Sequence, residues 1–551
     1  MKLIKRAAAA SLLVCIFAMV TMVPNAQIQI PEKIRVGLYF DSSSVSSFSV
    51  KAEKGVQIGC FKNDSFKSLV EEPSNNLLSI RKDTYYVNNN NVLKEYKPED
   101  KNIPAGEKLG PYHVQLPGTY NDLSSVNKQA QAYKQKGVAA YPAYNDSWQL
   151  WTGFYADLKA AQADITNNLR KKIGAGEYKI ISPSPTRTVI SSSTGATMLV
   201  FDSVSGVLQV RPKAQNNPYL FTVNGQSYRG DLEVRRITGS DMTLINVVPL
   251  EQYLYGVVPA EIESYSHPEA LKAQAVASRT YALKNLGKFK KWGFDLCNSV
   301  WDQLYKGYGV ETKATNKAVD DTKGKSVVYN GNVAEVFFFA SSGGMTEDAK
   351  NVFGVDIPYL KSVDDKYESA KSNHYSWEKT LTAEDIKGLM KKKGYDLGDI
   401  LSVTVTKTSN AGRPVELVIK GTKGEKKFEN DDCRYVFNLN SQWYSITTDV
   451  DVSVKGQGTD PVKTQLQAKK AMTSTGLKSI ETTASGKGGL SVVDGSKNKK
   501  TISMVPTTYK ITGKGWGHGV GMSQEGAKGM ASAGFKFDQI LKHYFPGTTI
   551  E

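Results

Sequence analysis

A glycine-rich run near the C-terminus constrains the fold of this chain more than any other stretch. Glycine occupies every second position from Gly513 to Gly521, and Trp516 and His518 lie within the run. Glycine is selected where the backbone needs a positive φ or where another group approaches closely. The run therefore predicts a shaped loop that contributes to a binding site. A glycine-rich surface hairpin is the alternative.

The length and the charge of the chain limit its organisation and its partners. A chain of 551 residues is too long for a single hydrophobic core and is expected to form roughly three or four domains. The formal net charge of +16 predicts an acidic partner, either nucleic acid or an anionic cell envelope.

The N-terminus decides between these partners. Residues Met1–Arg6 are basic, Ala7–Val23 are apolar, and Ala26 supplies the small residue of a cleavage site, which is the layout of an export signal. Pro24 is unfavourable so close to a cleavage site, so an uncleaved membrane anchor over residues 1–26 is the alternative. Both interpretations place the body of the protein outside the cytoplasm, extracellular or in the cell envelope. Nucleic acid is then not expected as a partner, and the membrane is contacted only through this segment.

Two folded parts are expected before residue 190. The alternating runs Ile34–Phe40 and Phe48–Ala52 predict a β-rich part over residues 31–110. Residues 111–178 predict the order strand, helix, strand, strand, helix, with YHVQ in the first strand and KQKG at the end of the first helix. This pattern is similar to the SPOR domain, a peptidoglycan-binding module, although any ferredoxin-like module would show the same order. The SPOR resemblance implies sugar-stacking residues among Tyr112, Tyr144, Trp148 and Trp151.

The rest of the chain is expected to form one large domain over residues 190–551. Residues Ile180–Thr194 are rich in Ser, Thr and Pro and predict a linker before it. Short strand-like runs between residues 197 and 235 are expected to extend the β-rich part, so that the SPOR-like module is inserted into it. Residues 454–500 are rich in Gly, Ser, Thr and Lys and predict a flexible, basic surface insertion.

Two helices are predicted on either side of a glutamate. The strand Met242–Val248 leads into a helix whose residues Leu250–Val258 present one apolar face. Residues Ser266–Glu269 form a capping box and open a second helix that ends near Asn285. Glu261 is expected in the short connection between the two helices.

Further elements are predicted in the C-terminal half. A strand is expected over Ala334–Ala340, followed by a sharp turn. The other predicted elements are a helix over 383–394, strands over 401–406 and 415–419, and a helix over 537–544.

Four separated strings carry a family resemblance. They are PLEQYLYGVVPAEI with EALKAQAVASRTYAL, then SSGGMTE, then PYLKSV, and finally GKGWGHGVGMSQEGAKGMA with ILKHYFPGT. In this order they are similar to the SpoIID/LytB family of stage II sporulation protein D and amidase enhancers. The resemblance covers residues 34–550 with insertions. It implies an α+β, multidomain fold in which a SpoIID-like catalytic core carries a β-rich N-terminal part and the inserted βαββα module.

The resemblance also implies an activity. Enzymes of this family are lytic transglycosylases of peptidoglycan glycan strands, and Glu261 matches their general acid. One carboxyl can protonate the glycosidic oxygen between N-acetylmuramic acid and N-acetylglucosamine, and can then accept the proton of the 6-hydroxyl that closes on C1. Such a carboxyl needs a raised pKa, which burial supplies. No cofactor is expected. A surface glutamate in a turn is the alternative for Glu261.

The family match implies a set of glycan-binding residues. They are Arg279, Gln303, Tyr305, Ser341, Ser342, Tyr359, Lys361, His518, Ser523 and Gln524. Cations suit the lactyl carboxylate of muramic acid, and polar groups suit sugar hydroxyls. Arg279 could instead satisfy carbonyls inside the fold. A Ser–His nucleophile pair is disfavoured, since no third partner is discernible.

Cysteine usage predicts neither a disulfide framework nor a metal site. Cys60, Cys297 and Cys433 are odd in number and scattered. Several relatives carry zinc ligands near the position of Cys297, but one Cys without a neighbouring His cannot complete such a site. No structural zinc is therefore expected.

A second function stays open. Some relatives are thought to stimulate a cell-wall amidase, so a non-catalytic, peptidoglycan-binding activator of an amidase is the alternative to a lytic transglycosylase. The resemblance implies a role in cell-wall remodelling, with sporulation as one setting.

Overall fold

The computed structural model describes residues 30–90, 92–213, 218–237, 240–454, 460, 462–464, 470–473, 475–479, 489–493 and 497–551. The predicted export signal or anchor, residues 1–26, lies outside the described residues. Within the described ranges, no helix is both long enough and apolar enough to cross a membrane.

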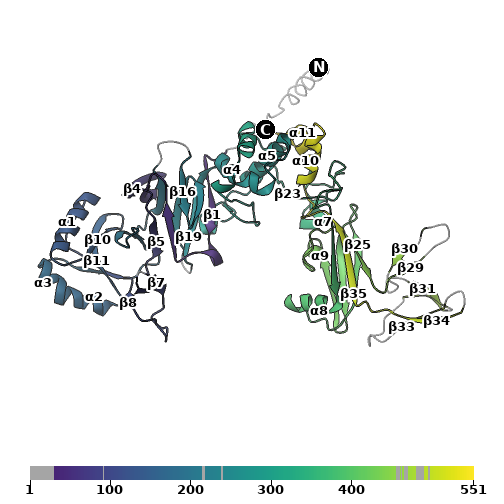
Figure 1. The fold of residues 1–551 in the computed structure, drawn as a ribbon, viewed down its shortest axis with the longest axis horizontal. Coiled ribbons are helices and arrows are strands. Elements are labelled where there is room, and N and C mark those ends of the chain that lie inside the picture. Colours follow the sequence, from purple (N-terminus) through teal and green to yellow (C-terminus); the bar gives the residue numbers. More distant parts are fainter. Residues whose placement is uncertain are drawn as a thin grey trace, which may run out of the picture.

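The chain forms two β-rich arms with helices between them, which confirms the expected α+β, multidomain architecture (Figure 1). The N-terminal arm, residues 33–249, is coloured purple to teal, and the C-terminal arm, residues 376–514, is coloured green to yellow. Helices α4, α5, α10 and α11 lie between the arms, so residues from both halves of the sequence meet there.

A seven-stranded sheet forms one layer of the N-terminal arm. Its order is β20 (Leu296–Cys297), β1 (Lys33–Tyr39), β19 (Met242–Pro249), β18 (Asp231–Arg236), β15 (Val207–Pro212), β3 (Val56–Lys62) and β4 (Ser65–Glu72). Strands far apart in the sequence are neighbours, since β1 pairs with β19 and β3 pairs with β15.

A ten-stranded sheet forms the other layer. Its order is β12 (Lys179–Ile181), β9 (Tyr112–Gln115), β11 (Trp148–Tyr155), β10 (Ala140–Tyr144), β14 (Thr197–Phe201), β13 (Thr188–Ser191), β5 (Leu78–Lys82), β2 (Ser47–Lys51), β16 (Leu220–Val223) and β17 (Gln226–Arg229). The small strands β6 (Tyr86–Asn89), β7 (Val92–Glu95) and β8 (Glu107–Leu109) form a separate three-stranded sheet.

One hydrophobic core joins both layers. Alternate residues of each strand point to the same face, so Val36 of the first sheet and Val50 and Ile80 of the second are buried in the same cluster. The strands after residue 197 therefore complete the β-rich part that begins at β1. The module after residue 111 lies between β8 and β13 in the chain, and its strands extend the ten-stranded sheet through the pairing of β10 with β14.

The inserted module has the predicted order and one further strand. It runs β9, α1 (Leu123–Gln135), β10, β11, α2 (Leu158–Asp164) continued by a π-helical turn and α3 (Arg170–Ile173), and then β12. The four strands lie in the order β12-β9-β11-β10, with antiparallel neighbours, which is a ferredoxin-like arrangement. Side chains of Asp122 and Asp157 cap the two helices.

The linker predicted over Ile180–Thr194 is wrong. This stretch contributes to β12 and forms all of β13, and Val189 and Ile190 are fully buried. The Ser, Thr and Pro content resembles that of a loop, but the consecutive residues Val189 and Ile190 are buried in two different hydrophobic clusters, on opposite faces of the strand. Three of the four expected sugar-stacking aromatic residues are buried as well: Tyr144, Trp148 and Trp151.

Helix α5 (Pro268–Lys284) is the centre of the helical region. It packs against α4 (Leu250–Glu261), α6 (Lys313–Asp321), α10 (Gln524–Ser532) and α11 (Phe537–Tyr544). Small residues such as Ala273 and Ala277 are fully buried and allow this close approach. The predicted apolar face of α4 is confirmed. The predicted capping box is wrong, because His267 is the N-cap and its Nδ1 accepts from the backbone N–H of Glu269 over 3.2 Å.

The C-terminal arm has its own hydrophobic core, which the expectation of a single domain over 190–551 did not include. Buried residues Ile386, Leu417, Phe437 and Ile511 belong to it. Its two three-stranded sheets are β24 (Ser376–Thr382), β35 (Thr508–Lys514) and β28 (Tyr444–Thr448), and β25 (Ile400–Thr408), β26 (Pro414–Gly421) and β27 (Gly424–Glu429). Its helices are α8 (Ala383–Lys392) and α9 (Asp432–Tyr435), and α7 (Ala349–Phe353) lies beside it.

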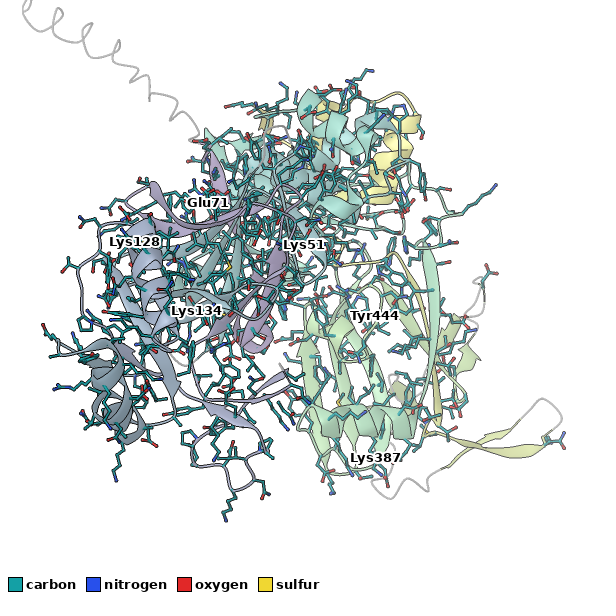
Figure 2. All side chains as sticks on the ribbon, turned by 60° about the vertical axis from the view of Figure 1, so that its left-hand side comes forward. Lys51, Glu71, Lys128, Lys134, Lys387 and Tyr444 are labelled. Atoms are coloured by element: carbon teal, nitrogen blue, oxygen red, sulfur yellow. The ribbon has the colours of Figure 1, made fainter. Side chains whose placement is uncertain are left out.

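Figure 2 marks the two arms by labelled side chains. Lys128 and Lys134 extend from α1 in the N-terminal arm, while Lys387 of α8 and Tyr444 of β28 belong to the C-terminal arm. The predicted insertion 454–500 falls within the sequence range of this second arm, and its described strands lie beside β35. Its described parts form the hairpins β29–β30 (Val452–Val454, Val462–Thr464), β31–β32 (Lys470–Thr473, Gly476–Ser479) and β33–β34 (Gly489–Val493, Lys499–Ser503). Its remaining residues lie outside the described residues, so its flexibility stays a prediction.

The strand predicted over Ala334–Ala340 is mostly absent. Only β23 (Phe338–Phe339) is a strand, and it pairs in parallel with β36 (Met522–Ser523). Ala334 and Val336 are apolar because they are buried in the main core. A short apolar run cannot distinguish a strand from such an irregular buried segment. The C-terminal strand β37 (Thr549–Ile550) pairs with β21 (Val327–Tyr329), which is also paired with β22 (Asn332–Val333).

Candidate active site

Glu261 is the last residue of α4, and not part of the connection in which it was expected. Pro259 lies inside the helix and lacks the N–H of a normal helical residue, and the chain becomes extended at Ile262. The carboxyl therefore lies at the negative end of the helix dipole, which disfavours its ionised form.

Burial raises the pKa of Glu261 above its usual range. Two weaker effects oppose this rise in pKa: the backbone N–H of Leu304 donates to Oε1 over 2.8 Å, and Lys306 contributes positive charge. No cation of the described chain forms an ion pair with this carboxyl within 4.0 Å. The side chain thus has one fixed oxygen, Oε1, while Oε2 keeps the freedom to carry a proton.

Gly256 brings the loop 298–306 against α4. A Cβ atom at this position would lie 2.7 Å from the ring of Tyr305 and 2.9 Å from the carbonyl of Gly307. The backbone N–H of Lys306 donates to the carbonyl of Gly256 over 3.2 Å. The absence of a side chain on the helix therefore allows the loop to place Leu304 at Glu261.

Gln303 and Tyr305 belong to this loop, but their side chains are buried and do not face solvent, so the expectation that they bind glycan is wrong. The hydroxyl of Tyr305 donates to Asn246 over 2.7 Å, and the hydroxyl of Tyr253 donates to Gln303 Oε1 over 3.2 Å. Both side chains fix the loop from below, and so support the position of Leu304.

Two exposed aromatic residues near Glu261 were missed by the sequence analysis. Trp301, on the same loop, is 79% exposed, and Tyr265, after α4, is 87% exposed. Asp302 anchors the loop beneath Trp301, because its carboxylate accepts from the hydroxyl of Tyr281 over 3.1 Å and from the backbone N–H of Cys297 over 2.7 Å. The signal available in the sequence was the position of Trp301, two residues before the candidate Gln303.

Arg279 is 0% exposed, which makes its expected contact with substrate wrong. Its guanidinium donates to both carboxylate oxygens of Glu251, over 2.9 and 2.6 Å, and to the carbonyls of Val319 and Lys325. Arg279 therefore joins α5 to α4 and α6 as a structural residue, which is the alternative left open for it.

Ser341 and Ser342 are buried against two acids and do not line an open surface, so their expected contact with glycan is wrong. Ser341 donates to Glu368, and the hydroxyl of Ser342 lies 2.8 Å from Asp365 and 2.5 Å from Glu368. Burial raises the pKa of both Asp365 and Glu368. The hydroxyl of Tyr544 donates to Asp365 over 2.8 Å, so this cluster ties the turn after β23 to α11.

Tyr359 and Lys361 differ from each other in accessibility. Tyr359 is buried, and its hydroxyl accepts from the backbone N–H of Glu335 over 2.8 Å, so its expected sugar contact is wrong. Lys361 is partly exposed and is paired with Asp356. Its role toward substrate stays a prediction.

His518 is held as a neutral ring. Its Nδ1 accepts from the backbone N–H of Val520 and its Nε2 donates to the carbonyl of Phe338, both over 3.1 Å. Burial, together with the charges of nearby arginines, lowers its pKa to about 3. Both nitrogens are occupied within the fold, so His518 cannot serve as a base for a serine.

The two remaining candidates of the glycine-rich segment are also structural. The hydroxyl of Ser523 accepts from the backbone N–H of Gly526 over 3.1 Å and caps α10. The side chain of Gln524 donates to Gln274 of α5 over 3.3 Å. Their predicted contact with substrate is wrong, because both side chains are buried.

Trp516 is the exposed aromatic residue of the glycine-rich loop, with 41% of its surface accessible. Its ring lies 5.1 Å from that of His374, whose Nδ1 is 3.8 Å from Glu525. Lys528 of α10 binds both Glu525, over 2.7 Å, and Glu263, over 3.0 Å. This chain of contacts places Trp516 on the same side of the helices as the segment that follows Glu261.

The described residues contain no group of three or more His, Cys, Asp or Glu side chains that could hold a metal ion. Cys297 is buried as a free thiol and lies 3.3 Å from the hydroxyl of Ser299. The absence of structural zinc stays a prediction from the sequence.

Two family models match the chain. The model described as stage II sporulation protein matches residues 238–329, which include α4, Glu261, α5 and the loop that holds Leu304. A domain of unknown function (DUF8618) matches residues 359–459, which form most of the C-terminal arm.

Known proteins are similar over most of the chain. An amidase enhancer of Bacillus subtilis is 28% identical over 443 residues, which cover 78% of this chain and 58% of that protein. An uncharacterized protein of Brachyspira hyodysenteriae is 28% identical over 71% of this chain and 91% of its own length. Stage II sporulation protein D of Bacillus subtilis is 30% identical over 319 residues, which cover 55% of this chain and 74% of that protein. By these matches, and by the four sequence strings of which the first contains Glu261, the chain belongs to the SpoIID/LytB family.

Proposed function

We propose that this protein is an exported peptidoglycan lytic transglycosylase that uses Glu261 as general acid and then as general base. The observation that carries the proposal is the state of this carboxyl. It is mostly buried at a helix C-terminus, its pKa is raised, it has no ion-pair partner among the described residues, and Leu304 fixes one of its oxygens.

In the first step, protonated Glu261 gives its proton to the glycosidic oxygen between N-acetylmuramic acid and N-acetylglucosamine. The C1–O bond breaks and positive charge develops at C1 of the muramoyl residue. In the second step, the 6-hydroxyl of the same residue attacks C1 and its proton passes to the Glu261 carboxylate. The product has a 1,6-anhydro-muramoyl end, no water is consumed, and the carboxyl regains its proton.

The surroundings of Glu261 suit both steps. A raised pKa keeps a fraction of the carboxyl protonated near neutral pH, as the acid step requires. The N–H of Leu304 is fixed at Oε1, so Oε2 is the oxygen that gives and regains the proton. General acid–base catalysis of this kind accelerates a reaction by about 10²–10⁴-fold.

Exposed aromatic rings supply the sugar-binding surface of this proposal. Trp301 and Tyr265 project near Glu261, and Trp516 lies on the glycine-rich loop. Rigid aromatic rings bind the apolar faces of sugar rings at low cost in conformational entropy. We assign substrate contact to these residues in place of the buried candidates.

The setting of the proposed activity is the cell envelope. The predicted export segment and the net charge of +16 support a location outside the cytoplasm, on an anionic wall. The order of helices and strands in the ferredoxin-like module supports the SPOR resemblance. We propose that this module binds glycan in a cavity of about 1070 Å³ beside α1, and that Tyr141 and Phe154 line this cavity. Sporulation is the setting that the name of stage II sporulation protein D favours.

Digestion of purified glycan strands tests the proposal. Wild-type protein should release fragments with 1,6-anhydro-muramoyl ends, detected by mass spectrometry, and Glu261→Gln should release none above background. Glu263→Gln is the matched control, because Glu263 is two residues away and is paired with Lys528. A wild-type product profile identical to that of Glu261→Gln would contradict the proposal.

A non-catalytic activator of a cell-wall amidase is the second candidate, and the name of the similar amidase enhancer favours it. The same preparation, mixed with a cell-wall amidase and intact peptidoglycan, separates the two functions. Faster release of stem peptides by the amidase, equal for the wild type and Glu261→Gln and without anhydro ends, would support the activator.

A further inference from the structure

We propose that a second pocket of the N-terminal arm binds a phosphate group carried on a small polyol or sugar. The pocket has a volume of about 280 Å³. It lies where β13 and β14 of the ten-stranded sheet approach β15 and β18 of the seven-stranded sheet. The short 3₁₀ helix Lys290–Trp292 closes one side. None of the residues assigned to the candidate active site lines it.

The side chains that line the pocket carry a net positive charge. Arg235, Arg236, Lys290 and Lys291 line it, and no described Asp or Glu does. Arg235 binds Glu233 through a bond of 2.6 Å from Nε, and the carboxylates of Asp83, Asp241 and Glu95 act on Arg236 from a longer range. Among the described residues, no acid forms an ion pair with Lys290 or Lys291. Cations grouped around a concave, partly dry surface attract an anion.

The carboxylate of Asp202, which lies between two lining residues in the sequence, is already occupied. Asp202, between Phe201 and Ser203, accepts from Arg187 over 3.1 Å and from Ser184 over 2.7 Å. Its described ion pair is with Arg187, and not with the lysines of the short helix. An oxyanion from outside the chain would supply the missing negative charge.

Two buried polar atoms at the pocket have no hydrogen-bond partner among the described residues. Thr188 is 2% exposed, and its Oγ1 is unpaired. Nε of Arg236 is unpaired too, although Nη1 of the same side chain donates to the carbonyl of Arg187 over 3.0 Å. Buried donors without partners are costly, so a ligand that accepts from both would be stabilised.

The shape indicates a phosphate ester in preference to a bare ion. Phe201, Leu208 and Val234 form an apolar floor, which suits the carbon skeleton of a carrier. Guanidinium groups bind phosphate oxygens through paired, charge-assisted hydrogen bonds. The pocket therefore offers cations to the phosphate and a dry surface to its carrier.

Binding of glycerol 3-phosphate to the purified full chain, followed by calorimetry at constant ionic strength, tests the assignment. Wild-type protein should bind it saturably, and tighter than inorganic phosphate or acetate. The double variant Lys290→Ala with Lys291→Ala should weaken binding by about tenfold. Thr188→Val keeps the shape of the side chain and should weaken binding by about threefold.

The matched control is Lys391→Ala with Lys392→Ala, which removes the same charge from the exposed end of α8 in the other arm. It should leave binding unchanged. Three outcomes would overturn the proposal: no saturable binding up to about 10 mM ligand, equal weakening by the control pair, or equal affinity for acetate. Inorganic phosphate binding as tightly as glycerol 3-phosphate would overturn the assignment of a carrier.

Discussion

The backbone N–H of Leu304 donates to Oε1 of Glu261 over 2.8 Å, so a loop that follows α5 fixes a carboxyl at the end of α4. The two residues are 43 positions apart in the chain, and the contact exists because Gly256 gives the loop room. Both the protonation and the direction of the carboxyl depend on this contact.

Glu261→Gln should stabilise the protein at neutral pH while it removes activity. A carboxyl with a raised pKa in the folded state binds protons more tightly there than in the unfolded chain. Its stabilising contribution is therefore complete at pH values below the unfolded pKa and is lost as the pH rises through the folded pKa. Glutamine does not ionise, so thermal unfolding at pH 7 should show a Tm higher by about 2 °C. The difference should vanish near pH 4, and a lower Tm for the variant at pH 7 would contradict the burial of the charge.

Gly256→Ala should displace the loop that carries Leu304. The new methyl group would lie 2.7 Å from Tyr305, at a cost of about 1–3 kcal/mol, and activity on glycan strands should fall with it. Gly388→Ala in α8 is the matched control, since a Cβ there meets nothing within 4 Å. That change should stabilise the protein by about 0.5–1 kcal/mol. Urea unfolding measures both, and equal effects at the two sites would refute the role of Gly256.

Arg279→Ala should be a stability variant and not a binding variant. It would leave Glu251 and two carbonyls without their buried partner, with a loss of about 3–5 kcal/mol. Denaturant unfolding should show this loss, while the KM of the folded fraction stays unchanged. A raised KM with unchanged stability would return Arg279 to the substrate site.

His518→Gln should retain most of the activity, because His518 holds the loop by hydrogen bonds and does not transfer protons. Its pKa is lowered from 6.5 to about 3 in the folded protein, so between these pH values the histidine is protonated in the unfolded chain and neutral in the folded chain. The stability of the wild type therefore falls as the pH drops from 6.5 toward 3, and the variant should lack that part of the loss. Unfolding curves from pH 4 to 7 test this. Loss of activity as complete as in Glu261→Gln, with an intact fold, would make His518 catalytic.

Trp301→Ala should weaken substrate binding without affecting the fold. The ring is 79% exposed, and Asp302 anchors the loop independently of it. The KM for glycan strands should rise by about tenfold, with a smaller change in kcat and an unchanged Tm. Val300→Ala, at the exposed neighbouring position, controls for loss of apolar surface. Equal effects of the two changes would argue against stacking on Trp301.

Periodic patterns allowed the correct prediction of several elements, and single residues were harder. The apolar face from Leu250 to Val258 and the helix over Phe537–Tyr544 both follow from one-sided burial, which leaves a repeat in the sequence. Helix α5 is surrounded on every side, so no repeat shows where Arg279 points. The helix α8 and the strands β25 and β26 of the C-terminal arm were predicted, but its separate core was missed because that core is assembled from distant segments.

The catalytic role of Glu261 stays a prediction, while the accessibility of the residues expected around it differs from what the sequence led us to expect. Glu261 was identified by its string, but most of the expected glycan-binding residues are buried and hold loops in place. A matched sequence string indicates that a residue matters to the family, but it does not show whether the side chain faces solvent or the core. Trp301 and Tyr265 lay beside the matched motifs, and their exposure follows from loop anchoring that no local pattern encodes.

Strand β10 of the inserted module pairs in parallel with β14, through Ala143 with Val200 and Tyr144 with Phe201. A module attached only by flexible linkers could swing freely, but one hydrogen-bonded into a shared sheet cannot turn without breaking that sheet. If the module binds a glycan strand as proposed, its binding cavity and the carboxyl of Glu261 lie at a fixed distance from each other. The glycan fragments released by the proposed activity would then have lengths close to a single value.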